Sequence, residues 1–174
     1  MSASLDHSTA DEPTAAIVDF LRAIGLKVQY AELGDACFLP GIEIRDGALR
    51  VDRARLRWPG DLLHEAGHLA VLPAALRALQ SGDLHGSEQA AHAGEAEATA
   101  WAYAACCALS LPADLLFHEG GYHGRGAALA MTFSLGVYPG LHGLMQAGMA
   151  HGVAEAKQLG AEPYPRMRRW LREQ

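Results

Sequence analysis

The pentapeptide His64-Glu65-Ala66-Gly67-His68 constrains the fold of this chain most, because its residues act together only on a helix. Four residues turn an α-helix by about 400°, so the two imidazoles share one face and lie about 40° out of line. In a random chain of 174 residues with nine His and eleven Glu, the expected number of occurrences of the pattern HExxH is about 0.03. Apolar or small residues flank the motif, so we expect a buried helix over residues 59–72.

Two imidazoles on one helix face can bind a single metal ion. Zn²⁺ is a typical ion for such ligands, with Zn–N bonds of about 2.0–2.1 Å. Glu65 lies beside them but points away from the ion, where it can hold a metal-bound water and accept its proton. The motif therefore predicts His64 and His68 as metal ligands and Glu65 as the catalytic base. A chance pair of core or surface histidines is the alternative that the motif leaves open.

A second segment can supply the third ligand that two imidazoles lack. Residues 95–109 are Ala-rich and typical of a helix, with Glu95 and Glu97 at its start. These two glutamates diverge by about 200° on a helix, so only one of them can face the metal. Glu95 shares its face with small residues and with Thr99, whose hydroxyl could accept the free N–H of a ligating histidine. We therefore favour Glu95 as the third metal ligand. Glu97 would then be a surface carboxylate or a capping partner at the start of the helix.

Together the two segments resemble the ImmA/IrrE family of zinc metallopeptidases. In that family HExxH, here HEAGH, precedes a helix of the form E-x-E-A-[N/D]-x-F-A, which matches part of GEAEATAWAYAACCALSLP. The resemblance covers residues 42–112 and implies a zincin-like peptidase domain with Glu95 as the third zinc ligand. Thr99 stands where the family has Asn or Asp, and Trp101 stands where it has Phe.

The rest of the chain favours a single α+β domain. We expect a flexible tail over residues 1–12 and one zincin-like metallopeptidase domain over residues 13–174. Residues 27–52 alternate between apolar and polar around Asp46-Gly47, a dipeptide that is typical of a tight β-hairpin. They predict a small antiparallel sheet of about three strands, packed against a mainly helical body. The expected helices begin at Pro13 and cover residues 59–72, 95–109, 127–135 and 141–159, with a polar connection carrying His85 and His92.

Composition limits the partners and the compartment. The chain has a net charge of −6, so it lacks the broadly basic surface by which proteins bind nucleic acid. We therefore expect no direct nucleic-acid partner. No apolar window reaches the ~18 residues of a membrane span, and residues 1–14 lack the features of a signal peptide. Three cysteines, two of them adjacent, fit no disulfide framework. We expect a cytoplasmic protein that contacts no membrane.

These residues and the resemblance together indicate zinc-dependent hydrolysis of peptide bonds in an intracellular protein or peptide. The reaction needs a donor to the oxyanion, and Tyr122, His123 and Arg125 in a Gly-rich segment are the candidates. The alternative for this segment is an ordinary surface loop. The substrate could lie as an added strand along an edge near residues 49–52. Two other functions stay open: a non-catalytic zinc-binding regulatory or interaction module with a zincin fold, and a metal hydrolase acting on a non-peptide bond.

Overall fold

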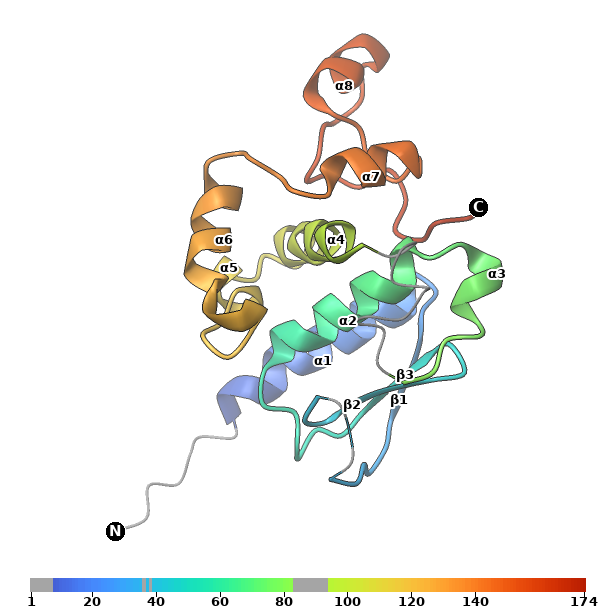
Figure 1. The fold of residues 1–174 in the computed structure, drawn as a ribbon, viewed down its shortest axis with the longest axis vertical. Coiled ribbons are helices and arrows are strands. Elements are labelled where there is room, and N and C mark those ends of the chain that lie inside the picture. The colour runs from blue at the N-terminus through green and yellow to red at the C-terminus, as the bar shows by residue number, and fades with distance from the viewer. Residues whose placement is uncertain (1–7, 36, 38, 83–93) are drawn as a thin grey trace.

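A small sheet and a layer of helices beside it form the centre of the fold (Figure 1). The structure is a computed structural model that describes residues 8–35, 37, 39–82 and 94–174. Helices α1 (Ser8–Ala23) and α2 (Pro59–Val71) lie side by side next to the sheet, and α4 (Glu95–Ala108) packs against α2. This arrangement confirms the predicted α+β class with a small sheet and a mainly helical body.

The sheet differs from the prediction in the direction of one strand. Its strands are β1 (Lys27–Tyr30), β2 (Ile42–Arg45) and β3 (Ala48–Val51), in the order β1-β3-β2. The β2–β3 hairpin is antiparallel as expected, but β1 pairs with β3 in parallel, so the prediction of an antiparallel sheet was wrong. The loop after β1 carries the chain past the position next to β1, so that β2 forms the far edge of the sheet. The hairpin then brings β3 back into the position between them, where β3 runs parallel to β1.

The hairpin turn follows the sequence signal. Asp46 and Gly47 both have positive φ, at 50° and 69°, as a type I′ turn requires. Because β3 is the central strand, it has neighbours on both sides. The expectation that a substrate could be added as a strand near residues 49–52 was therefore wrong.

Several helix boundaries also differ from the prediction. Helix α1 begins at Ser8, so Pro13 lies inside it. Of the tail predicted over residues 1–12, residues 8–12 belong to this helix and residues 1–7 lie outside the described residues. The polar connection at residues 83–93, with His85 and His92, also lies outside them. The single helix predicted over residues 141–159 is two helices, because Gly148 at a φ of +65° turns the chain between them. The remaining elements are α3 (Ala74–Arg77), α5 (Ala113–Leu116), η2 (Tyr122–Gly124), α6 (Gly126–Ser134), α7 (Leu141–Gln146) and α8 (Val153–Leu159).

The hydrocarbon core of a bilayer is about 30 Å thick, which takes about 20 predominantly apolar residues to cross as a helix. Among residues 8–35, 37, 39–82 and 94–174, no helix is both long enough and apolar enough to do so.

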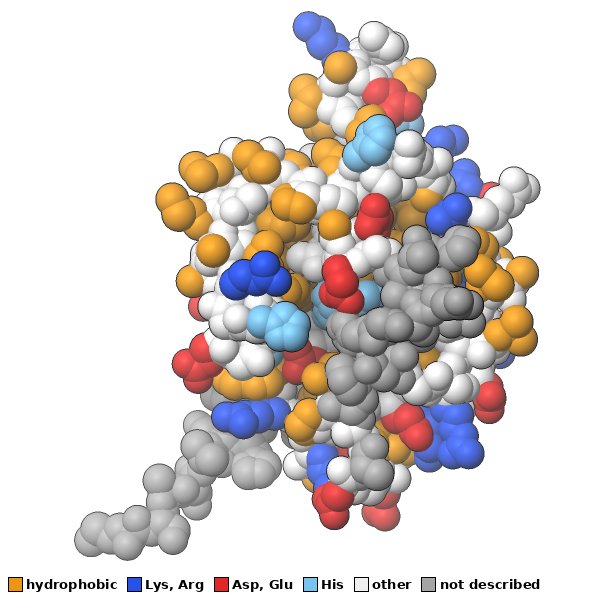
Figure 2. Space-filling model, in the orientation of Figure 1, with side chains coloured by type: hydrophobic (Ala, Val, Ile, Leu, Met, Phe, Trp, Pro, Cys, Tyr) orange, Lys and Arg blue, Asp and Glu red, His pale blue; other side chains and the backbone are white. Residues whose placement is uncertain are grey.

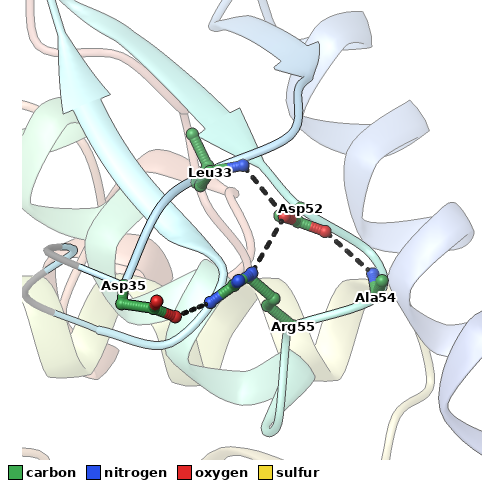
Figure 3. A network of polar contacts seen from close by, with 5 residues as sticks. All are labelled: Leu33, Asp35, Asp52, Ala54 and Arg55. Carbon is green, nitrogen blue, oxygen red and sulfur yellow. Dashed lines mark hydrogen bonds and ion pairs between the residues drawn. The ribbon is translucent and has the colours of Figure 1, made fainter.

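A buried carboxylate at the end of β3 holds the loop that joins β1 to β2 (Figure 3). Asp52 accepts hydrogen bonds from the backbone N–H of Leu33 at 2.9 Å and of Ala54 at 3.0 Å. Arg55 lies 3.7 Å from the same carboxylate and also pairs with Asp35. These bonds hold the pKa of Asp52 below its ordinary value, the Leu33 N–H contributing most.

We expect Asp52→Asn to weaken the fold in a pH-dependent way. A carboxyl whose pKa is lowered by folding adds stability above its unfolded pKa of about 3.9, and that stability is lost as the pH falls through the folded pKa. The variant should therefore be less stable than the parent at pH 7, by a margin that shrinks toward pH 2. Urea unfolding of the metal-free proteins across this range measures the margin. Asp114→Asn is the control, since Asp114 is exposed and lies outside the network of Asp52 and Arg55. A margin that is independent of pH would contradict the assignment.

Candidate metal centre

The helix that carries HEAGH and the helix that carries Glu95 meet at a glycine. A Cβ atom on Gly67 would lie 2.6 Å from the backbone carbonyl oxygen of Ala98, so a larger residue there would push α4 away from α2. Pro59 occupies the first turn of α2, where the missing N–H of proline costs no hydrogen bond. The close approach brings the first turn of α4 beside the turns of α2 that bear the histidines.

His64, His68 and Glu95 converge on one point. The Nε2 atoms of the two histidines are 3.1 Å apart. The carboxylate oxygens of Glu95 lie 3.2 Å from Nε2 of His64 and 3.3 Å from Nε2 of His68. Both histidines are buried, whereas the Glu95 side chain is 59% exposed, so the cluster is open to solvent on the α4 side.

The dimensions of this triangle suit a zinc ion. Bonds of about 2.0–2.1 Å at tetrahedral angles place neighbouring ligand atoms about 3.3–3.4 Å apart. The distance of 3.1 Å between the imidazoles, and those of 3.2 and 3.3 Å from the imidazoles to Oε2 and Oε1 of Glu95, differ from that spacing by a few tenths of an ångström at most. Two imidazole nitrogens and one carboxylate oxygen are also a donor set of catalytic zinc sites, which keep a fourth position open. The residues present therefore fit the ion.

The other two glutamates of the motifs lie outside the triangle. Glu65 is 3% exposed and lines the pocket in front of the cluster, where its carboxylate can act as a base. Glu97 packs between α4 and α7, since a Cβ atom on Gly143 would lie 2.2 Å from its Oε1. Of the two glutamates considered for the third ligand, the structure thus brings Glu95 to the histidines and Glu97 to α7.

Tyr122 contacts the cluster from the Gly-rich loop. Its hydroxyl lies 3.3 Å from Nδ1 of His64, and its ring packs edge-on against the imidazole. Burial raises the pKa of Tyr122, so the hydroxyl stays protonated at neutral pH and can accept a bond from Nδ1–H. A proton on Nδ1 leaves the lone pair of Nε2 for a metal. We predicted Thr99 for this accepting position, but at His64 the tyrosine hydroxyl occupies it, and Thr99 lines the same pocket.

The loop reaches the cluster through an unusual backbone. Tyr122 and His123 have φ of 53° and 52°, a region that side-chain-bearing residues seldom adopt. Such strained residues persist only where the surrounding structure holds them, and they are frequent at functional sites. The half-buried Tyr122 touches the cluster, while the exposed His123 lies on the wall of the pocket.

A pocket of about 950 Å³ opens in front of the cluster. His64, Glu65 and Glu95 line it, as do His123 and Arg125 from the loop. Figure 2 shows histidine and acidic side chains close together near the centre of this face. All the predicted ligand and catalytic residues line this pocket except His68, which is fully buried and contacts His64 and Glu95 from behind the pocket lining.

Sequence reasoning missed a buried pair that holds the loop to α2. Nε2 of His118 lies 2.8 Å from Oδ1 of Asp61, and the His118 ring stacks on Trp58 with centroids 4.5 Å apart. Burial raises the pKa of Asp61, an effect that the bond with His118 opposes. The pair ties the start of the Gly-rich loop to the first turn of α2. Since 57 residues separate its members, no local pattern could have indicated it.

The arrangement can hold one divalent ion and present a proton acceptor beside it. It also offers the open pocket that a substrate of some size requires. No known protein family, no curated protein and no solved structure matches this chain significantly.

Proposed function

We propose that the protein is a zinc-dependent peptidase that hydrolyses peptide bonds of a protein or peptide substrate. The observation that carries the proposal is the convergence of His64, His68 and Glu95, whose nitrogen and oxygen atoms lie 3.1–3.3 Å apart, close to the spacing of ligand atoms around tetrahedral zinc. The buried carboxylate of Glu65 beside this triangle supports hydrolysis over simple metal storage, because a structural zinc site needs no base. The resemblance to the ImmA/IrrE family is consistent with the same activity.

The chain's own residues have distinct roles in the proposed reaction. Zinc, when bound by His64, His68 and Glu95, supplies a Lewis acid that lowers the pKa of water to about 7. The carboxylate of Glu65 accepts the proton of the attacking water and passes it to the leaving amine. Tyr122 keeps the imidazole of His64 oriented through Nδ1.

The Gly-rich loop provides the candidates for stabilising the oxyanion. His123 and Arg125 line the outer wall of the pocket, where their N–H groups can donate to a substrate carbonyl oxygen. Tyr122 stays a third candidate, because a hydroxyl that accepts a bond from Nδ1–H of His64 keeps its own proton to donate.

We further propose that the protein works in the cytoplasm on an intracellular substrate. Cys37, Cys106 and Cys107 are all free thiols in the structure, which suits a reducing compartment.

The direct test is cleavage of a defined peptide library followed by mass spectrometry. The zinc-loaded protein should release products that disappear when a chelator removes the metal and return when one equivalent of zinc is added. Metal analysis should give one zinc per chain. A protein that binds zinc but cleaves no peptide would contradict the proposal and favour the non-catalytic module.

A further inference from the structure

The pocket in front of the metal centre has a second wall of different chemistry. One wall is the ligand end of α4 with Glu95, Ala96 and Thr99. The opposite wall comes from α6 and consists of Ala128, Leu129, Thr132 and Phe133, here called the α6 wall. These positions are spaced i, i+1, i+4 and i+5, so they lie on one face of the helix.

Three of the four residues of the α6 wall are apolar, and the hydroxyl of the fourth, Thr132, donates to the backbone carbonyl of Ala128 within the helix. Phe133 is 1% exposed, and its ring packs against Tyr103 and Phe117 at centroid distances of 4.7 and 5.3 Å. Leu39 and Pro139 add further apolar surface to the pocket. Ala128 and Ala96 both line the pocket with short side chains, which occupy little of its volume.

Two acidic residues that line the same pocket, Asp61 and Glu95, already have partners inside the protein. Asp61 pairs with His118, and Glu95 pairs with both histidines. The cation among the lining residues is Arg125, which is exposed at the start of α6. A charged substrate side chain beside the α6 wall would lose its hydration without gaining one of these paired groups, whereas an apolar side chain would be removed from water.

We propose that the α6 wall is the subsite that selects the substrate, and that it takes a large apolar side chain next to the bond that is cut. This inference rests on the proposed function, since it concerns the substrate of the same centre. Leu129 and Ala128 are its specificity-determining residues: Leu129 supplies contact surface, and Ala128 supplies the space.

Binding of short peptide hydroxamates, which attach to zinc through their terminal group, tests the inference without turnover. Four probes that differ only in one side chain, Leu, Phe, Ala or Asp, are titrated calorimetrically into the zinc-loaded protein. We expect the Leu and Phe probes to bind about 10-fold or more tightly than the Ala and Asp probes, since each methylene in an apolar pocket contributes about 10-fold or more.

The variant Ala128→Phe should fill the subsite and reduce the affinity for the Leu and Phe probes to that for the Ala probe. Ala127→Phe is the matched control, because Ala127 is an exposed neighbour on α6 that does not line the pocket. Equal binding of all four probes, or a preference for Asp through Arg125, would overturn this inference alone. Failure of every probe to bind a protein that holds zinc, together with no peptide cleavage, would overturn the proposed function and this inference with it.

Discussion

Replacing Glu65 by Gln should lower kcat for peptide hydrolysis about 10³-fold while zinc stays bound. The amide has the shape of the carboxylate but cannot accept a proton, and removing a general base typically costs 10²–10⁴-fold in rate. Glu65 lies outside the ligand triangle, so the affinity for zinc should change little. Glu65 is also 3% exposed and adjacent in sequence to His64, so no other carboxylate replaces it easily.

The measurement is the steady-state rate on one peptide that the parent protein cleaves, with zinc content determined for each preparation. Glu119→Gln is the matched control, because Glu119 is an exposed glutamate on the nearby loop that does not line the pocket. Its rate should equal that of the parent. A Glu65→Gln protein that contains zinc and retains full activity would show that Glu65 is not the base.

Replacing Glu95 by Ala should weaken zinc binding by more than about 100-fold. Loss of a residue that only supports a ligand typically costs 10–100-fold in metal affinity, and loss of a ligand itself should cost more. The carboxylate of Glu95 contacts both imidazoles, so its removal leaves two ligands in place of three. Competition with a chromophoric chelator at pH 7 gives the affinity.

Glu97→Ala provides the comparison on the same helix turn. Because Glu97 packs toward α7, its removal should change zinc affinity by less than about 3-fold, within the usual scatter for a residue that is not a ligand. The opposite result, with Glu97→Ala losing zinc and Glu95→Ala keeping it, would move the third ligand to Glu97. Circular dichroism of both variants separates loss of a ligand from loss of the fold.

Local patterns predicted the elements of the site well. HEAGH predicted a buried helix, and α2 covers that segment over Pro59–Val71. The Ala-rich segment predicted a helix from Glu95, which is where α4 begins. Both predictions succeed because helix periodicity and caps depend on neighbouring residues.

Features that depend on distant contacts were predicted poorly. The direction of β1 relative to β3 depends on how the chain crosses the sheet, which strand propensity does not encode. The break between α7 and α8 at Gly148 is accompanied by pairing of Ala150 with Met167 from the C-terminal segment. In the sheet and at the helix break alike, contacts between segments distant in sequence decided a feature that the local pattern could not predict.

The amino-acid sequence by itself determined that two imidazoles and a neighbouring carboxylate would share one buried helix, because a four-residue spacing is a property of the helix alone. Only the tertiary structure decided which glutamate of α4 faces them, since that depends on the helix crossing at Gly67. It also decided that Tyr122, 58 residues away from His64, would hold the imidazole. Packing between distant segments sets such contacts, and no spacing along the chain records them.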